Sequence, residues 1–340
     1  MKQVTTTGSR RSLLRVLAIS AGFWGLSGPI TTSARAQAVD KPLSRLQQLR
    51  IGYQKSAVNL VILKQQAVLE KRFPHAQIKW VDFPAGPQLL EALAVGSLEF
   101  GLTGDSPPVF AQAAGKDLVY VGAEPAKPES SAILVAKDSA IKTLADLKGQ
   151  RIALQKGSSA HYLLVQAVEK AGLSWTDIQP IYLAPADARA AFERQSVDAW
   201  AIWDPFYAAT ELALAPRVLT TGTGLSNNNS FYLASRAFAT DYPDVLAVLF
   251  DELSRADQFV QQHRPEAIKL ISAYSGLDAG VVSLFLQRRP ASPVGPISPK
   301  TLQSQQQVAN SFQKLGLIPK RIDVAQIVWQ PKATVLAKAK

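Results

Sequence analysis

The sequence of 340 residues contains no cysteine, and it has only three histidines and one methionine. The absence of cysteine excludes disulfides, thiolate metal sites and a cysteine nucleophile, although it does not fix the compartment. The HExxH, GxSxG and glycine-rich P-loop patterns are absent as well, so we predict no catalytic residue, no metal site and no cofactor. No dense run of Lys and Arg with interleaved aromatic residues is present, and nucleic acid is therefore not an expected partner.

What is present is the composition of an ordinary globular protein, with 47% hydrophobic and 19% charged residues. The length is enough for about two domains with a sizeable core. The formal net charge is +11, but residues 1–38 carry five of these charges and no acid, which leaves +6 for the rest of the chain. This mild excess is compatible with an anionic ligand.

The first 38 residues have the pattern of an export signal. Ser9, Arg10 and Arg11 open a twin-arginine pattern, residues 16–30 form a short apolar stretch, and residues 34–36 and 36–38 each offer a cleavage site between small residues. We therefore predict a signal peptide of the twin-arginine type that is removed, leaving a protein in the periplasm. The alternative is a membrane anchor, but the apolar run is short and rich in glycine and serine. No later segment approaches a spanning length.

The most informative stretch is residues 151–171. Residues 151–154 are typical of a short buried strand, Gly157 supplies a turn, and Ser158 is a good N-cap for a helix over 160–171. A strand, a glycine turn and a helix start leave backbone N–H groups at the positive end of the helix dipole, which is a ready anion site. The alternative is an ordinary strand-to-helix turn with a serine cap.

The rest of the chain alternates between strand and helix patterns, which predicts an α/β fold with parallel sheets flanked by helices. In such sheets ligands bind beyond the carboxyl ends of the strands, here Gln54, residues 104–106 and residues 122–124. The expected strands are 49–53, 78–83, 100–102, 118–122, 151–154, 178–183, 197–203 and 217–221, and the expected helices are 57–72, 88–95, 109–114, 160–171, 186–195 and one that begins near residue 204.

Two further extended runs, 132–136 and 231–235, bracket the second series of strands and helices, so we interpret them as crossings between two lobes. The predicted first lobe comprises residues 39–131 and 236–340, and the second lobe comprises residues 132–235 including the crossing strands. From residue 237 onward the pattern is mostly helical, which suggests helices that pack back on the first lobe.

Several candidate side chains have competing interpretations. Asp105 would repel an anion and is interpreted as a cap of its own helix. Trp203 is either a core residue or a wall of the cleft. Asp204 is most simply a cap, since a carboxylate beside a bound anion weakens binding unless the ligand also carries a cation. Arg288 and Arg289 are interpreted as a solvated helix end, with added positive potential at the cleft as the alternative.

Six motifs in this order resemble the periplasmic substrate-binding proteins of ABC importers, and most closely the aliphatic sulfonate branch of the group that also includes nitrate and taurine binders. The motifs are residues 51–55, 86–93, 101–108, 157–161, 201–206 and 231–233. The resemblance implies a type II periplasmic-binding-protein fold, in which two lobes joined by a two-strand hinge close over the ligand. It also implies a cleft formed by Gln54, Gly104, Asp105, Ser158, Ser159, Ala160, His161, Trp203 and Asp204.

The function that the resemblance implies is delivery of an aliphatic sulfonate to an ABC permease and its ATPase for sulfur acquisition, by a protein expected to be a monomer. Backbone N–H groups of Ser159, Ala160 and His161 and the hydroxyls of Ser158 and Ser159 would surround the three sulfonate oxygens, while the side chain of His161 either donates to the ligand or extends the first turn. Nitrate, taurine or another small anion remain alternatives. Enzymes on the same fold are the less favoured alternative: sulfinate desulfinases need a cysteine, and thiamin-pyrimidine synthases use a lysine and several histidines.

Overall fold

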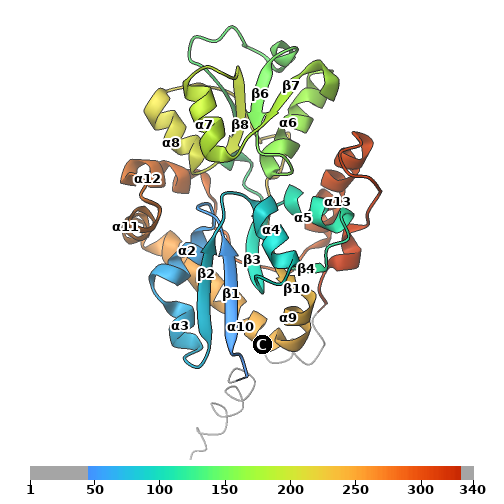
Figure 1. Cartoon of the computed structure of the whole chain (residues 1–340). Helices are drawn as coiled ribbons and strands as arrows, with labels where there is room; N and C mark the ends of the chain where they lie inside the picture. The colour runs from blue at the N-terminus through green and yellow to red at the C-terminus, as the bar shows by residue number, and fades with distance from the viewer. Residues whose placement is uncertain (1–44, 331–340) are drawn as a thin grey trace, which may run out of the picture. The chain divides into compact units, whose positions relative to one another are not determined.

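Two five-stranded sheets form the frame of the protein in a computed structural model that describes residues 45–330 (Figure 1). The predicted export signal lies outside the described residues. The first sheet has the strand order β2-β1-β3-β10-β4 and the second has the order β7-β6-β8-β5-β9. The strands are β1 (Gln48–Tyr53), β2 (Gln77–Asp82), β3 (Phe100–Gly104), β4 (Leu118–Glu124), β5 (Ser131–Val135), β6 (Arg151–Leu154), β7 (Gln179–Tyr182), β8 (Ala199–Trp203), β9 (Arg217–Thr221) and β10 (Ser230–Ser235).

The two sheets repeat one topology. In the first, β1 pairs in parallel with β2 and β3, and β10 runs antiparallel between β3 and β4. In the second, β6 pairs in parallel with β7 and β8, and β5 runs antiparallel between β8 and β9. The single antiparallel strand of each sheet is therefore the strand that the chain enters after crossing from the other sheet. As a result, β1 corresponds to β6 and β3 corresponds to β8.

Helices cover both faces of each sheet. In β10, Tyr232 and Ala234 face one side and Phe231 and Leu233 the other, as the alternation of a strand requires. The first side packs against α2 (Val58–Gln65), α9 (Arg236–Asp241), α10 (Pro243–Gln262), α11 (Arg264–Ser275) and α12 (Ala279–Arg288), and the second packs against α4 (Gly86–Ala94), α5 (Ser106–Ala113) and α13 (Pro299–Lys314). The second sheet lies between α6 (Ser159–Lys170) and α7 (Pro185–Glu193), and α8 (Phe206–Leu214) follows β8. Short helical segments complete the fold, namely α3 (Val68–Arg72), Pro128–Ser130, Leu144–Leu147, Trp175–Asp177 and Val324–Ile327.

The predicted order of strands and helices is confirmed, and the strand boundaries 151–154 and 217–221 are reproduced. The helical C-terminal part packs on the first sheet, as expected. Two details differ. The predicted helix 57–72 is two helices, because Ala67 adopts a left-handed conformation with φ 49° and breaks it. The strand at 230–235 belongs to the first sheet, so the chain crosses through residues 125–130 and 222–229 and the predicted lobe boundary at residue 235 lies one strand too late.

Within residues 45–330, no single helix has the length and apolar character needed to cross a membrane. The bent pair α11 and α12 passes the same test of length and composition when the two helices are taken together.

Candidate functional site

A small cavity lies where the carboxyl ends of β1 and β3 of the first sheet meet those of β6 and β8 of the second. Its volume is about 50 Å³, which is room for roughly four groups the size of water. We call it the inner cavity. The residues that line it are Gln54, Ser56, Gly86, Leu102, Thr103, Gly104, Pro107, Lys127, Ser130, Ser158, Ser159, Trp203, Asp204, Asn228, Ser230, Phe285 and Arg289.

The wall from the second sheet is the start of α6. Ser158 occupies the N-cap position with extended backbone, but its hydroxyl donates to the carbonyl of Gln155 at 2.8 Å rather than accepting from the helix. The N–H of His161 donates to the Ser158 carbonyl at 2.9 Å. The N–H groups of Ser159 and Ala160 have no acceptor in the described part of the chain, as the first turn of a helix dictates. Two peptide donors therefore remain at this wall, and the Ser159 hydroxyl lies beside them within reach of the Asp105 carboxyl.

Gly104 allows this wall to approach the first sheet. A Cβ atom at position 104 would lie 2.0 Å from Oγ of Ser159. The close approach brings the end of β3 against the first turn of α6, and it explains why a glycine ends this strand.

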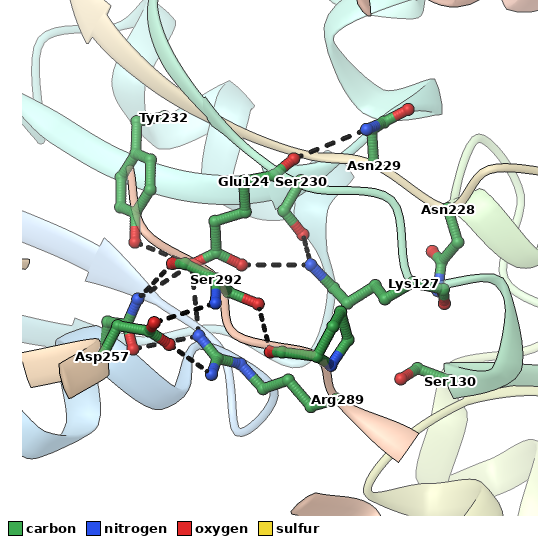
Figure 2. Close-up of polar contacts among 12 residues, drawn as sticks. Glu124, Lys127, Ser130, Asn228, Asn229, Ser230, Tyr232, Asp257, Arg289 and Ser292 are labelled. Atoms are coloured by element: carbon green, nitrogen blue, oxygen red, sulfur yellow. Dashed lines mark hydrogen bonds and ion pairs between the residues drawn. The ribbon is translucent and has the colours of Figure 1, made fainter. Parts of the chain in front are cut away.

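The wall from the first sheet carries charge, as Figure 2 shows. Nζ of Lys127 lies 3.1 Å from Oε2 of Glu124 and donates to the Ser230 hydroxyl at 2.7 Å. The Arg289 guanidinium donates to Asp257 at 2.8 Å and lies 3.8 Å from Glu124. We call Glu124, Lys127, Asp257 and Arg289 the buried ion network. It holds two cations and two carboxylates, so its charges balance.

The network has neutral partners that fix its geometry. The Tyr232 hydroxyl donates to Glu124 at 3.0 Å, Asn59 accepts from Arg289 at 3.0 Å, and the Ser292 N–H donates to Asp257 at 2.9 Å. Burial favours the neutral form of Glu124, but Lys127 and Arg289 outweigh it and lower the pKa of this carboxyl. Burial lowers the pKa of Lys127, and Glu124 opposes that shift.

Asp204 lies at the side of the cavity next to Trp203. Its Oδ1 accepts from the Ala208 N–H at 3.0 Å and from Arg288 at 3.1 Å, whereas Oδ2 is buried without a partner among the described residues. Burial raises the pKa of Asp204 to about 7, and Arg288 opposes that shift. Arg288 also pairs with Glu211 and lies 3.7 Å from the centre of the Tyr207 ring. A carboxyl with this pKa changes from its neutral to its ionised form within the physiological range of pH.

Comparisons with known proteins identify the family of the chain. Residues 81–273 match the family described as NMT1/THI5 like. The crystal structure of the periplasmic aliphatic sulphonate binding protein from Escherichia coli is 51% identical, with a TM-score of 0.78 over 84% of this chain and 93% of that chain. The chain belongs to the NMT1/THI5-like family and to the aliphatic sulfonate-binding proteins.

Two further relatives show the range of similarity. The alkanesulfonate-binding protein from Xanthomonas axonopodis pv. citri, solved bound to MOPS, is 51% identical with a TM-score of 0.81 over 83% of this chain and 98% of that chain. A taurine-binding periplasmic protein of Escherichia coli is 26% identical, covering 75% of this chain and 88% of that protein. The periplasmic-binding-protein fold that the resemblance implied is thus confirmed.

Of the nine predicted cleft residues, six line the inner cavity: Gln54, Gly104, Ser158, Ser159, Trp203 and Asp204. Asp105 and Ala160 are buried next to lining residues but do not line it. Asp105 does not cap its helix as expected, because its side chain accepts from the Ser106 hydroxyl at 2.9 Å. Asp204 does act as expected, since its carboxyl accepts from the first turn of α8.

His161 is the predicted residue whose placement differs most. Its ring is fully buried among the aromatic rings of Phe110, Trp175 and Phe312, and its Nδ1 accepts from the Gly157 N–H at 3.1 Å. Burial, and then the charge of Lys156, lower its pKa to about 4. The side chain is therefore neutral and shapes the turn from within, and it does not line the cavity.

Sequence reasoning missed the charged wall. Lys127, Ser130, Asn228 and Ser230 lie on or beside the two crossing segments, where no local pattern marks a site. Arg289 was visible as part of an Arg-Arg-Pro motif, but its interpretation as a solvated helix end is wrong, since it is 4% exposed. Arg288 is not solvated either, because Asp204, Glu211 and Tyr207 surround it. Within residues 45–330, no cluster of His, Asp or Glu is arranged to hold a metal ion.

Proposed function

We propose that this protein binds an aliphatic sulfonate outside the cytoplasm and delivers it to an ABC importer for sulfur acquisition. The observation that carries the proposal is the inner cavity, which is bounded by the start of α6 on one side and by Lys127 on the other. The relatives named above are binding proteins for sulfonates and taurine. The membrane permease and ATPase are the proposed partners, the periplasm is the proposed location, and the proposed working form is a monomer.

The sulfonate head is the part of the ligand that suits this cavity. A sulfonate stays charged at physiological pH, so the site needs hydrogen-bond donors and no titrating base. The Ser159 N–H group, the Ser159 hydroxyl and Nζ of Lys127 supply three donors around three oxygens, and the Ala160 N–H group follows in the same turn of α6. Hydrogen bonds to a charged group contribute about 1.5–3 kcal/mol each before desolvation. Three or four support roughly micromolar binding, about 8 kcal/mol.

Taurine is a second candidate, and one observation favours it. The unpartnered Oδ2 of Asp204 lies in a residue that lines the cavity, and an ammonium group on the ligand would pair with it. The two candidates predict opposite roles for Asp204. A plain alkanesulfonate is repelled by the ionised carboxyl, whereas taurine is attracted by it.

Isothermal titration with methanesulfonate, ethanesulfonate, taurine, sulfate and nitrate tests the proposal. We expect heat with the sulfonates and a dissociation constant in the micromolar range. Binding of nitrate alone would reject the sulfonate assignment, and binding of taurine alone would restrict the ligand to aminosulfonates.

A further inference from the structure

Asp105 is a buried carboxyl directly after β3 to which the proposed function gives no role. It is 3% exposed and occupies the N-cap position of α5. Asp105 does not line the inner cavity, whereas Gly104 and Ser159 do. The close approach at Gly104 brings the Ser159 hydroxyl within hydrogen-bonding reach of the Asp105 carboxyl. The Ser159 hydroxyl is therefore the link between this carboxyl and the cavity.

The surroundings of Asp105 do not favour a negative charge. Among residues 45–330 it forms no ion pair, and the positive charge that acts on it, Lys127, is already paired within the buried ion network. The other titratable groups that interact with it are Tyr120 on β4 and Tyr162 on α6, and burial raises the pKa of both phenols, so they are neutral. Burial raises the pKa of Asp105 as well, and its hydroxyl partners and Lys127 only partly offset that shift.

The segment that carries Asp105 is held in place from several sides. Its Oδ1 accepts from the Ser106 hydroxyl at 2.9 Å. Its backbone carbonyl accepts from the Gln305 amide, which also donates to the Tyr120 hydroxyl at 2.9 Å. The carboxyl is thus fixed against Ser159, and its protonation state decides the direction of the hydrogen bond between them.

The two protonation states give the anion opposite partners. A hydroxyl has one proton to donate. If Asp105 is ionised, Ser159 donates that proton to the carboxylate and turns its lone pairs toward the cavity. If Asp105 is protonated, the carboxyl donates to Oγ of Ser159, and the hydroxyl proton is free for an oxygen of the anion. The second arrangement also leaves no second negative charge buried beside the ligand.

We infer that Asp105 is a positioning residue that stays protonated, donates to Ser159 and thereby directs the hydroxyl proton of Ser159 toward the bound anion. This inference rests on the proposed function, because it assumes that the sulfonate head occupies the inner cavity. The carboxyl that the sequence suggested would repel an anion then helps to bind it.

Isothermal titration of methanesulfonate at neutral pH into Asp105→Asn and Asp105→Ala tests the inference. The asparagine amide is a permanent donor of nearly the same shape, so Asp105→Asn should bind about as tightly as the parent protein. Asp105→Ala loses the donor and should weaken binding by about two- to tenfold, which corresponds to one ordinary hydrogen bond. If the carboxyl were ionised, both changes would remove a negative charge near the anion and tighten binding by about tenfold or more.

Asp278→Asn is the matched control. Asp278 occupies the N-cap position of α12 as Asp105 does for α5, but it is exposed and does not line the inner cavity. This variant should bind methanesulfonate as the parent does.

Infrared spectroscopy gives a second readout that does not require the two Asp105 variants to fold. In Asp204→Asn protein made with isotope-labelled aspartate, the carbonyl stretch of a protonated aspartate should be present at neutral pH, with and without methanesulfonate. Loss of this band in a folded Asp105→Asn variant would assign it to Asp105. Tighter binding in both variants, or the absence of the band, would overturn the inference and leave the proposed function intact. Failure of the parent protein to bind any sulfonate would overturn both.

Discussion

The two walls of the inner cavity offer an anion different chemistry. On the side of the second sheet, the start of α6 has peptide N–H groups and a hydroxyl, which carry no net charge and need no counterion, while Asp204 at the end of β8 is the one titratable side chain lining that side. The wall from the first sheet has full charges, but each cation there is paired with a carboxylate. Positive side chains at a binding site therefore do not by themselves make it electropositive. The peptide donors at the start of α6 supply attraction that nothing in the protein already neutralises.

We propose that the buried ion network mainly stabilises the wall from the first sheet, whereas the start of α6 binds the anion. Lys127 takes part in both, because it is bonded to Glu124 and Ser230 and also lines the cavity. Variants that change stability and affinity separately test these two roles.

The largest effect is expected on stability, from Arg289→Met. This change leaves Asp257 buried without the cation that pairs with it, whereas Glu124 keeps Lys127, and breaking such a buried pair costs about 3–5 kcal/mol of unfolding free energy. Urea unfolding measures it. Arg255→Met is the control, since Arg255 is exposed beside Glu252 and should cost less than about 1 kcal/mol. Equal small losses in both variants would show that the network does not stabilise this wall.

The next effect is on affinity, from Lys127→Met. Loss of one charge-assisted hydrogen bond should weaken methanesulfonate binding by about 10- to 150-fold, or 1.5–3 kcal/mol. The variant also removes the lysine that pairs with Glu124, so the free energy of unfolding of the variant should fall. Adding Glu124→Gln should restore stability but not affinity. Recovery of both would mean that Lys127 acts on the wall and not on the ligand.

A smaller effect is expected from pH. Burial raises the pKa of Asp204 to about 7, so ionisation in the folded protein is unfavourable and its cost to stability grows as pH rises from about 4 to 7. Above pH 7 the carboxylate would repel an anion, at a cost on the order of 2–3 kcal/mol for charges about 6 Å apart. Methanesulfonate binding measured by titration should therefore weaken at least about tenfold between pH 5.5 and 8.5.

Asp204→Asn is the control for this pH dependence, because it keeps the shape of the neutral carboxyl and does not titrate. Its methanesulfonate affinity should be constant over the same range. Taurine separates the two candidate ligands, since its binding should strengthen with pH in the parent protein. A pH dependence that survives in Asp204→Asn would assign it to another group.

Much of the frame could be predicted from sequence because its signals are local. The strand at 151–154, the turn at Gly157 and the helix start near Ser159 follow from residues within one stretch of chain, and the structure reproduces them. The break at Ala67 could not be predicted, since alanine gives no sign of a left-handed conformation.

The charged wall could not be predicted for a different reason. Lys127 and Arg289 are 162 positions apart in the sequence, and only the packing of α12 and the crossing segments brings both to one cavity. The position of the His161 side chain also depends on residues that are far away in the sequence. Its position next to Ser159 and Ala160 favours a side chain near the anion, but Phe110 and Phe312 from distant helices hold its ring within the core.

The most direct test of the account compares Ser159→Ala with Ser159→Pro. Ser159 is the first residue of α6 and follows an extended residue, so proline fits there and removes the N–H without breaking the helix. Titration with methanesulfonate should show binding weakened about fivefold by alanine, which removes the hydroxyl, and by about a further tenfold or more by proline, which also removes the peptide donor. If the proline variant, folded as judged by its thermal unfolding, binds as tightly as the alanine variant, the peptide donor does not hold the anion and the account is contradicted.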